Sequence, residues 1–334
     1  MTATIRVPAP SFSSPLASAL LQFLKLKRAA GYRYQEEGRA LYALDRFLAQ
    51  TLAPSDPVIT LAIVRAFVAR RGEESETTRA HRLSLIRQVC LFLAMEEPRT
   101  AIPGKGWLRI QRRGFVPRIL SLEEGGRFLD ACGTLPRSHC SPLRGTVLGT
   151  ALVLLYLTGL RAGELLRLTD ADVDLATKVM HIRDSKFGKS RLVPIADDVA
   201  DRLRRCRTEV ARHFGTRGPD DPFFPAPSGH LYSISALRAA FHDVLSRANI
   251  PRHLGGRSLR LHDLRHSFAV LRLVLWVRRH ADLGPRLPAL ATYLGHVGMA
   301  SSQRYLQTTE DLLHELVSRH EVRFGHLIDD GGRP

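Results

Sequence analysis

The chain has 334 residues, a length that fits two domains at the usual size of about 100–200 residues each. Hydrophobic residues make up 44% and charged residues 24%, which excludes a disordered or fibrous chain and predicts a folded globular protein. The 49 Lys and Arg residues against 32 Asp and Glu leave a net charge of +17, which indicates a polyanionic partner.

The cysteine spacing and the lengths of the apolar segments indicate where in the cell the protein is expected. The cysteines form no C-x-x-C pair, so neither a zinc ribbon nor a disulfide framework is indicated. The N-terminal residues lack the apolar stretch of a signal peptide, and the apolar run 147–160 is too short to span a bilayer. We expect a cytoplasmic protein without membrane contact, in which all four cysteines are buried and reduced: Cys90, Cys132, Cys140 and Cys206.

The first part of the chain predicts helices and no strand. Hydrophobic periodicity and helix-ending glycines favour four amphipathic helices, at 15–30, 36–50, 60–71 and 76–93. Three Pro, three Gly and six basic residues then crowd into 98–118, a composition typical of an extended linker along a phosphate backbone. We therefore expect a helical domain at 10–97, an interdomain linker at 98–118 and a second domain at 119–334.

Both halves of the chain are basic. Residues 1–118 carry 19 basic and 9 acidic side chains, and residues 119–334 carry 30 and 23. A protein that contacts DNA with one domain would concentrate the excess there. The even distribution favours two domains that hold one duplex between them.

The second domain is predicted to be mainly helical with a small antiparallel sheet. Ser121 and Glu124 form a capping-box pattern, and a long apolar helix at 143–158 ends at Gly159. Alternating β-branched residues on both sides of a K-F-G-K turn predict a hairpin over 178–195. Helices are expected from residue 196 onward, with breaks near 215–230, 251–257 and 284–288.

Candidate catalytic residues occur in a fixed order. The pair in H-D-L-R-H means little alone, because 14 His and 43 Arg give about two H-x-x-R matches by chance, and two occur. The order of several motifs along the chain makes the signal more specific. The motif T-G-L-R-A-G-E-L and the K-F-G-K turn precede this pair, and Y-L-G-H and a later tyrosine follow it. The residues are Arg161, Lys186, His262, Arg265, His296 and Tyr305.

Two Arg, a Lys, two His and a Tyr in this order resemble the catalytic signature of the tyrosine recombinase family, also called phage integrases. The resemblance covers most of the chain. It implies a C-shaped clamp in which a SAM-like four-helix domain at 10–97 binds the core site and a catalytic domain at 119–334 cuts and rejoins DNA. It also implies metal-free chemistry without a cofactor, since Asp and Glu are absent from the signature positions.

The chemistry of phosphodiester cleavage suits these residue types. Arg161 and Arg265 would clamp the non-bridging oxygens, because guanidinium groups present forked, permanently charged donors. Tyr305 would attack the phosphorus, since a phenol with a pKa of about 10 is a good enough leaving group for religation. The alternative for Arg161 is a helix-terminal side chain paired with Glu164. Tyr293, which competes as nucleophile, is expected to pack inside.

The remaining signature residues would handle protons and bind phosphate. In the family, the first Lys of a K-x-G-K turn is the general acid, which implies that Lys186 protonates the leaving 5′-oxygen and that Lys189 binds phosphate. His262 and His296 would donate hydrogen bonds to the phosphate, and His262 could also accept the tyrosine proton. The neighbouring Asp263 and His266 are expected to serve the helix or its packing.

The spacing inside the catalytic domain points to mobile elements. From Arg265 to His296 the chain runs 31 residues, longer than the usual family interval, through an expected extended helix and a Pro-bounded turn. This looks more similar to recombinases of transposons and integrative elements than to the branch that resolves chromosome dimers. The apolar helical pattern in the tail 311–334 fits either a helix packed on its own domain or one exchanged between protomers.

The resemblance implies a site-specific recombinase that integrates, excises or transposes a mobile element through a 3′-phosphotyrosyl intermediate. Double-stranded DNA, a tetramer on two DNA sites and accessory recombinases are the expected partners, in a bacterial cytoplasm at the nucleoid. Three alternatives remain: a type IB topoisomerase-like enzyme, a catalytically idle DNA-binding accessory protein, and a basic RNA-binding module. The target DNA sequence cannot be identified from the 43 arginines.

Overall fold

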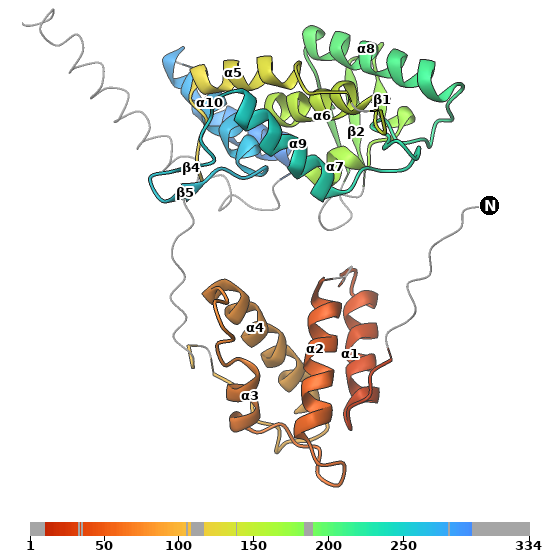
Figure 1. The fold of residues 1–334 in the computed structure, drawn as a ribbon. Coiled ribbons are helices and arrows are strands. Elements are labelled where there is room, and N and C mark those ends of the chain that lie inside the picture. Colours follow the sequence, from red (N-terminus) through yellow and green to blue (C-terminus); the bar gives the residue numbers. More distant parts are fainter. Residues whose placement is uncertain are drawn as a thin grey trace, which may run out of the picture. The chain divides into compact units, whose positions relative to one another are not determined.

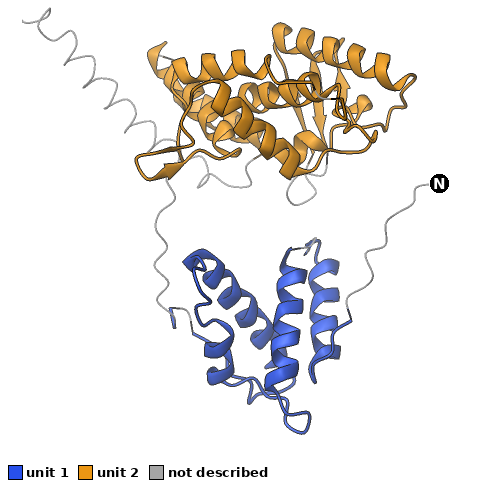
Figure 2. Cartoon of the chain, in the orientation of Figure 1, with its two compact units in different colours: residues 1–115 blue, residues 116–334 orange. Residues whose placement is uncertain are grey.

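The computed structural model describes residues 11–32, 34, 36–104, 106–107, 117–137, 139–183, 190–279 and 281–295. The chain forms two compact units, residues 1–115 and 116–334, shown in different colours in Figure 2. The division falls inside the predicted linker 98–118, whose bounds stay a prediction. Within the described ranges, no helix is both long and apolar enough to cross a membrane.

Unit 1 consists of helices where the sequence predicts them (Figure 1). Side-chain oxygens start two of them, since Thr60 accepts from the backbone N–H of Ile63 and Ser75 from that of Thr78. The third helix is shorter than predicted and ends at Phe67. The four helices are α1 (Ala17–Ala29), α2 (Glu36–Thr51), α3 (Leu61–Phe67) and α4 (Glu76–Leu93).

The core of unit 1 lies between these helices and includes buried side chains of all four, such as Phe23, Leu41, Phe67 and Ile86. The chain that follows α4 stays against this unit. The backbone N–H of Ala101 donates to the Ile59 carbonyl at 2.8 Å, and the Arg65 guanidinium lies 5.6 Å from the ring centroid of Trp107. The first part of the predicted linker therefore packs on unit 1.

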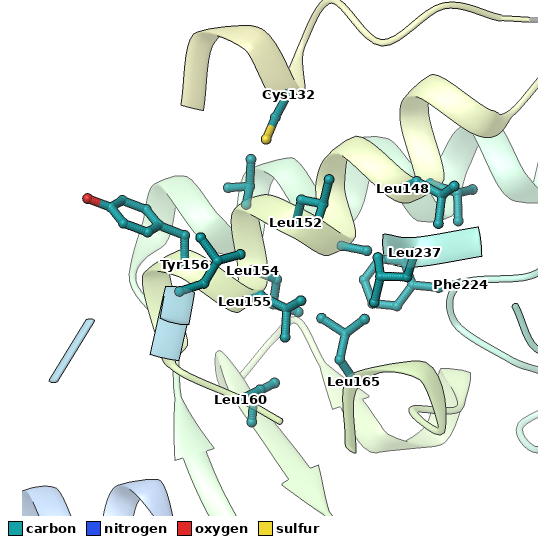
Figure 3. Packing of buried hydrophobic residues seen from close by; sticks show 14 of the residues in the cluster. Cys132, Leu148, Leu152, Leu154, Leu155, Tyr156, Leu160, Leu165, Phe224 and Leu237 are labelled. Carbon is teal, nitrogen blue, oxygen red and sulfur yellow. The ribbon is translucent and has the colours of Figure 1, made fainter. Parts of the chain in front are cut away.

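Unit 2 is built around one apolar helix. After α5 (Leu122–Cys132), whose start carries the predicted Ser121–Glu124 capping box, the helix α6 (Arg144–Thr158) is buried along most of its length. It packs against α5 and against three later helices, α8 (Asp197–Phe214), α9 (Ile234–Arg247) and α10 (Asp263–Arg278). Figure 3 shows leucines of α6 among side chains that include Cys132 of α5 and Leu237 of α9.

Small antiparallel sheets complete unit 2. Strands β1 (Val173–Asp174), β2 (Val179–Ile182) and β3 (Arg191–Pro194) form one sheet in that order. The β2–β3 pair confirms the strands of the predicted hairpin, whose turn lies outside the described residues. The sequence predicts only a break where a second hairpin forms, between β4 (His253–Leu254) and β5 (Arg257–Ser258), because strands of two residues carry no alternation.

The interval after Arg265 is helical, as expected, but its break is elsewhere. The helix α10 ends at Arg278, and α11 (Leu283–Leu294) then runs through the predicted break 284–288. That prediction is wrong because Pro285 lies in the first turn of α11, where a backbone N–H has no helical partner, and because Pro288 is tolerated inside the helix. The tail 311–334 lies outside the described residues.

The mainly helical fold with small antiparallel sheets is thus confirmed. The prediction for the cysteines is confirmed for Cys90, Cys132 and Cys206, which are buried. It is wrong for Cys140, which is exposed.

Candidate active site

A left-handed glycine places the first catalytic candidate. Gly159 ends α6 with φ of 64°, and Arg161 then becomes the N-cap of the short helix α7 (Ala162–Leu166). A Cβ atom on Gly159 would lie 2.7 Å from Cδ1 of Phe268 and 2.9 Å from Cδ2 of Leu294. Glycine is required here both for the backbone turn and for the close approach of α10 and α11.

Arg161 joins α7 to the end of α11. Its Nη1 donates to Oε1 of Glu164 at 2.6 Å, and its Nη2 donates to the carbonyl of Gly295 at 3.0 Å. The ion pair considered as the alternative for this residue is therefore present. The side chain remains 27% exposed, and a guanidinium has five N–H donors, so the pair and a phosphate contact are compatible.

Arg265 lies in the first turn of α10 and is only 2% exposed. Its Nη1 donates to the Gly159 carbonyl at 2.7 Å, and its Nη2 donates to the Leu294 carbonyl at 2.6 Å. The start of α10 is held by Asp263, which is buried and accepts from the backbone N–H of Arg260 at 2.8 Å. This confirms that Asp263 serves the helix.

A third arginine, Arg191, binds Glu164 and the end of α11 as well. Arg191 opens β3, and its Nε donates to the Tyr293 carbonyl at 2.8 Å. Its two Nη atoms donate to the two carboxylate oxygens of Glu164, at 2.9 and 3.2 Å. Burial by itself raises the pKa of Glu164, but hydrogen bonds and charge from Arg191, together with hydrogen bonds from Arg161, outweigh it and lower the pKa to about 2. Glu164 is therefore a buried anion between two cations.

Three guanidiniums thus bind three successive backbone carbonyls, those of Tyr293, Leu294 and Gly295. These carbonyls end α11, where they lack helical N–H partners and carry the negative end of the helix dipole. We call this set the carbonyl end of α11. His296, one of the predicted site residues, follows it directly in the sequence.

His262 caps α10 beside these arginines. Part of the His262 ring faces solvent. Desolvation of the rest and the positive charges of Arg265, Arg161 and Arg260 lower the pKa of His262 to about 4. The ring of His266 lies at right angles to it, with 4.9 Å between centroids. At neutral pH His262 is therefore an uncharged imidazole that can accept a proton.

A basic depression of about 580 Å³ opens beside His262. One wall is the side of α9, and the other is the segment that leads from β4 to α10. Desolvation and then the charges of Arg252 and Arg238 lower the pKa of His242 in this depression. Its basic lining suits a polyanion and consists of Arg238, His242, Arg252, Arg260 and His262.

The structure brings together three of the six predicted site residues, namely Arg161, His262 and Arg265. Lys186, His296 and Tyr305 lie outside the described residues. Sequence reasoning missed Arg191, because no pattern separates one strand-opening arginine from 42 others. Its signal is its place two residues after the K-F-G-K turn.

Tyr293 packs only partly inside, so this prediction is confirmed in part. Its ring is half-buried and stacks on Phe268, with 5.7 Å between centroids, and burial raises its pKa to about 12. Both features disfavour it as a nucleophile. In the described parts of the chain, no group of three or more His, Cys, Asp or Glu side chains is placed to hold a metal ion.

Comparisons with known proteins identify the family. The pattern of the Phage integrase family matches residues 120–311. The integrase/recombinase-type protein y4rE of Sinorhizobium fredii is 34% identical over 306 residues, which cover 91% of this chain and 95% of y4rE. This identity extends over both units.

Solved structures share the fold. The integrase of transposon Tn1549, in complex with transposon right end DNA, superposes with a TM-score of 0.61 at 17% identity and covers 90% of this chain and 99% of that one. A lambda integrase dimer bound to a core site gives a TM-score of 0.53 at 16% identity, covering 87% and 76%. Such homologues bind DNA, and the lambda integrase does so as a dimer. The chain belongs to the phage integrase family and is a site-specific tyrosine recombinase that cleaves and rejoins DNA.

Proposed function

We propose that this recombinase cuts DNA by in-line attack of Tyr305 on a phosphodiester, which leaves a 3′-phosphotyrosyl bond and frees a 5′-hydroxyl. Arg161 and Arg265 stabilise the charge on the non-bridging oxygens, and Lys186 protonates the departing 5′-oxygen. The phosphotyrosyl bond keeps the energy of the broken phosphodiester, so a 5′-hydroxyl of a partner strand can reseal it without ATP.

The two histidines complete the proposed site. His262 accepts the proton of the attacking tyrosine, which requires an uncharged ring, and its pKa of about 4 keeps the ring uncharged at neutral pH. His296 donates a hydrogen bond to the phosphate. No metal ion or cofactor takes part in this proposed mechanism.

The observation that carries the proposal is the convergence of Arg161 and Arg265 at the carbonyl end of α11, with His262 near enough for both charges to lower its pKa. Of the two arginines, Arg161 is the more exposed and can meet a phosphate directly. Arg265 is buried, so its contact with a phosphate requires that the groups covering it move when DNA binds.

DNA binding draws on both units. We propose that residues 10–97 bind the core site, that 98–118 follow the duplex and that 119–334 carry the chemistry, as a clamp around one duplex. The net charge of +17 and the basic depression beside His262 support this arrangement. Two bound duplexes and four protomers form the proposed recombining complex, in the bacterial cytoplasm at the nucleoid, with accessory recombinases as further partners.

The proposed substrate is a mobile genetic element. The long interval between Arg265 and His296 and the shared fold with the Tn1549 integrase support integration, excision or transposition of such an element. The identity to y4rE along 91% of the chain supports an integrase of the same kind.

The test is covalent capture. Suicide substrates cut from the DNA that flanks the gene are incubated with the protein and separated by denaturing electrophoresis. We expect an adduct whose peptide map places the DNA on Tyr305, normal binding but no adduct with Tyr305→Phe, and a retained adduct with the matched control Tyr293→Phe. An adduct formed by Tyr305→Phe contradicts the assignment, and no adduct with any flanking DNA favours an idle accessory protein.

A type IB topoisomerase shares the phosphotyrosyl chemistry, so a second readout separates it. The same protein is given a supercoiled plasmid with two copies of the captured site. Recombinant circles support the recombinase, whereas relaxation without recombinants supports the topoisomerase.

A further inference from the structure

We propose that Arg191 is a positioning residue for strand cleavage: by tying Glu164 to the carbonyl end of α11, it holds that end in register with Arg161 and Arg265. This inference rests on the proposed function. It adds a residue that contacts no DNA yet sets the geometry of the groups that do.

The geometry singles out Arg191 among the many arginines of the chain. One guanidinium binds both oxygens of the Glu164 carboxylate and, through Nε, the carbonyl of Tyr293. The three donors are used on elements that are far apart in sequence, α7 and α11, while the side chain itself belongs to β3. A planar, forked donor set fixes both direction and distance, which a flexible ammonium does not.

Glu164 passes this constraint on to the phosphate clamp. Its Oε1 accepts from Nη1 of Arg161, and its Oε2 accepts from the backbone N–H of the same residue. Arg161 and Arg191 then donate to carbonyls two residues apart, those of Gly295 and Tyr293. The result is a closed loop of contacts in which a shift of Arg191 moves the carboxylate, the Arg161 side chain and the end of α11 together.

The surroundings leave Arg191 little freedom. Its side chain is 9% exposed. A Cβ atom on Gly295, which has a φ of 69°, would lie 2.9 Å from Nη1 of Arg191. The helix end is therefore shaped around this guanidinium, and the side chain acts on the DNA through its neighbours and not by contact.

Loss of Arg191 has an electrostatic signature. Arg191 lowers the pKa of Glu164, whereas burial raises it. When the charge and the hydrogen bonds of Arg191 are removed, the effect of burial is less compensated and the pKa of Glu164 rises. The groups that remain near this carboxylate are Arg161 on its own helix and His262 at the start of α10. The helix α9, which packs against α7, carries Arg238 and His242. Protonation of Glu164 then releases Arg161, so the variant gains a loss of cleavage rate at acidic pH in addition to the one that protonation of His262 causes in the wild type.

The experiment uses the full-length protein and the suicide substrate captured by the wild type. Single-turnover adduct formation and DNA affinity are measured for Arg191→Gln and Arg191→Lys as a function of pH. We expect Arg191→Gln to slow cleavage about 100-fold at unchanged affinity, the loss that a displacement of about 1 Å produces. Arg191→Lys keeps the positive charge and should cleave faster than Arg191→Gln. Only Arg191→Gln should show the additional loss of cleavage rate at acidic pH that protonation of Glu164 causes, which we call the acidic limb. A further change, Glu164→Gln in the Arg191→Gln background, removes that limb.

Arg217→Gln is the matched control. Arg217 is 10% exposed, pairs with Asp170 at 2.8 Å and binds the Pro222 carbonyl, so like Arg191 it is a largely buried arginine that holds a carboxylate and a backbone carbonyl. We expect this variant to cleave at the wild-type rate. Equal losses for Arg217→Gln and Arg191→Gln, or a wild-type rate and pH profile for Arg191→Gln, overturn the inference.

A DNA-free arm separates this inference from the proposed function. Hydrogen exchange at residues 290–295 is measured on the free proteins, and we expect faster exchange in Arg191→Gln than in Arg217→Gln. A wild type that forms no adduct refutes the proposed function alone. Unchanged exchange at the end of α11 refutes the positioning role even where the wild type cleaves.

Discussion

Nη2 of Arg161 lies 3.0 Å from the carbonyl oxygen of Gly295, so the N-cap of one helix is bonded to the last turn of another that is 134 residues away. The same guanidinium binds Glu164 and remains partly exposed. Arg161 therefore serves the protein with two donors and offers the remaining ones to a phosphate. A substitution that keeps the positive charge but removes the planar set of N–H donors tests whether Arg161 binds both the protein and a phosphate.

Arg161→Lys should slow cleavage far more than it weakens binding. An ammonium cannot reach Glu164, Gly295 and a phosphate at once, so stabilisation of the transition state is lost while the positive charge stays. We expect the single-turnover rate of adduct formation to fall about 10²–10³-fold. Arg127→Lys, on the exposed side of α5, is the control with a wild-type rate. A normal rate for Arg161→Lys contradicts the clamp.

Glu164 makes stability depend on pH in the acidic range. Its pKa is about 2 in the folded protein against an ordinary 4.5, so its contribution is complete above pH 4.5 and is lost as the pH falls towards 2. The shift corresponds to about 3 kcal/mol. Urea denaturation at a series of pH values should show a steeper loss for the wild type than for Glu164→Gln.

At neutral pH the same substitution leaves the buried Arg191 without its carboxylate. We expect Glu164→Gln to lower the free energy of unfolding by about 3–5 kcal/mol at pH 7. Glu123→Gln, at an exposed position of α5, is the control and should change it little. Parallel pH curves for the wild type and Glu164→Gln would show that the carboxylate is not held as an anion.

His262 reports on the charges of the clamp. Desolvation and then the charges of Arg265 and Arg161 lower its pKa to about 4, so removal of one charge raises it. We expect Arg161→Gln to shift the NMR titration of the His262 ring to higher pH. The pKa of His262 is lower in the folded protein than its ordinary value of 6.5, so at acidic pH the unfolded chain binds a proton more readily. His262 therefore destabilises the fold at acidic pH, and this destabilisation disappears as the pH rises towards 6.5. An unchanged titration would place Arg161 too far from His262 for the proposed site.

Local signals in the sequence predict the helices well. Capping residues such as Ser75 and Ser121 and the apolar periodicity of α6 are properties of a few neighbouring residues, so they can be read without a structure. The break placed at 284–288 shows the limit of this approach. Proline is a helix breaker on average, but at the start of α11 its missing N–H leaves no partner unsatisfied.

The site could be predicted only in part. Arg161, His262 and Arg265 stand in motifs, whereas Arg191 acts through contacts to α7 and α11 that span 27 and 102 residues of sequence. Such a side chain is recognised by its burial and its partners. The capping signal at α7 was available, since Glu164 three residues after Arg161 is the position from which a carboxylate bonds back to the cap.

Gly159 tests the close packing that places Arg265. Its left-handed backbone disfavours any side chain by about 1–2 kcal/mol, and the added methyl group meets Phe268 and Leu294 at less than 3 Å. Overpacking of this kind adds about 1–3 kcal/mol. Gly159→Ala should therefore lower the free energy of unfolding clearly more than Gly255→Ala does.

Gly255 is the matched control because it has a similar φ of 56° with nothing within 4 Å of the added Cβ atom. Urea denaturation of the two variants separates backbone strain, which they share, from steric conflict, which only Gly159→Ala has. Since Arg265 donates to the Gly159 carbonyl, the displaced turn should also slow adduct formation in Gly159→Ala alone. Equal losses of stability in the two variants would mean that α10 and α11 do not pack against this turn as closely as the structure indicates.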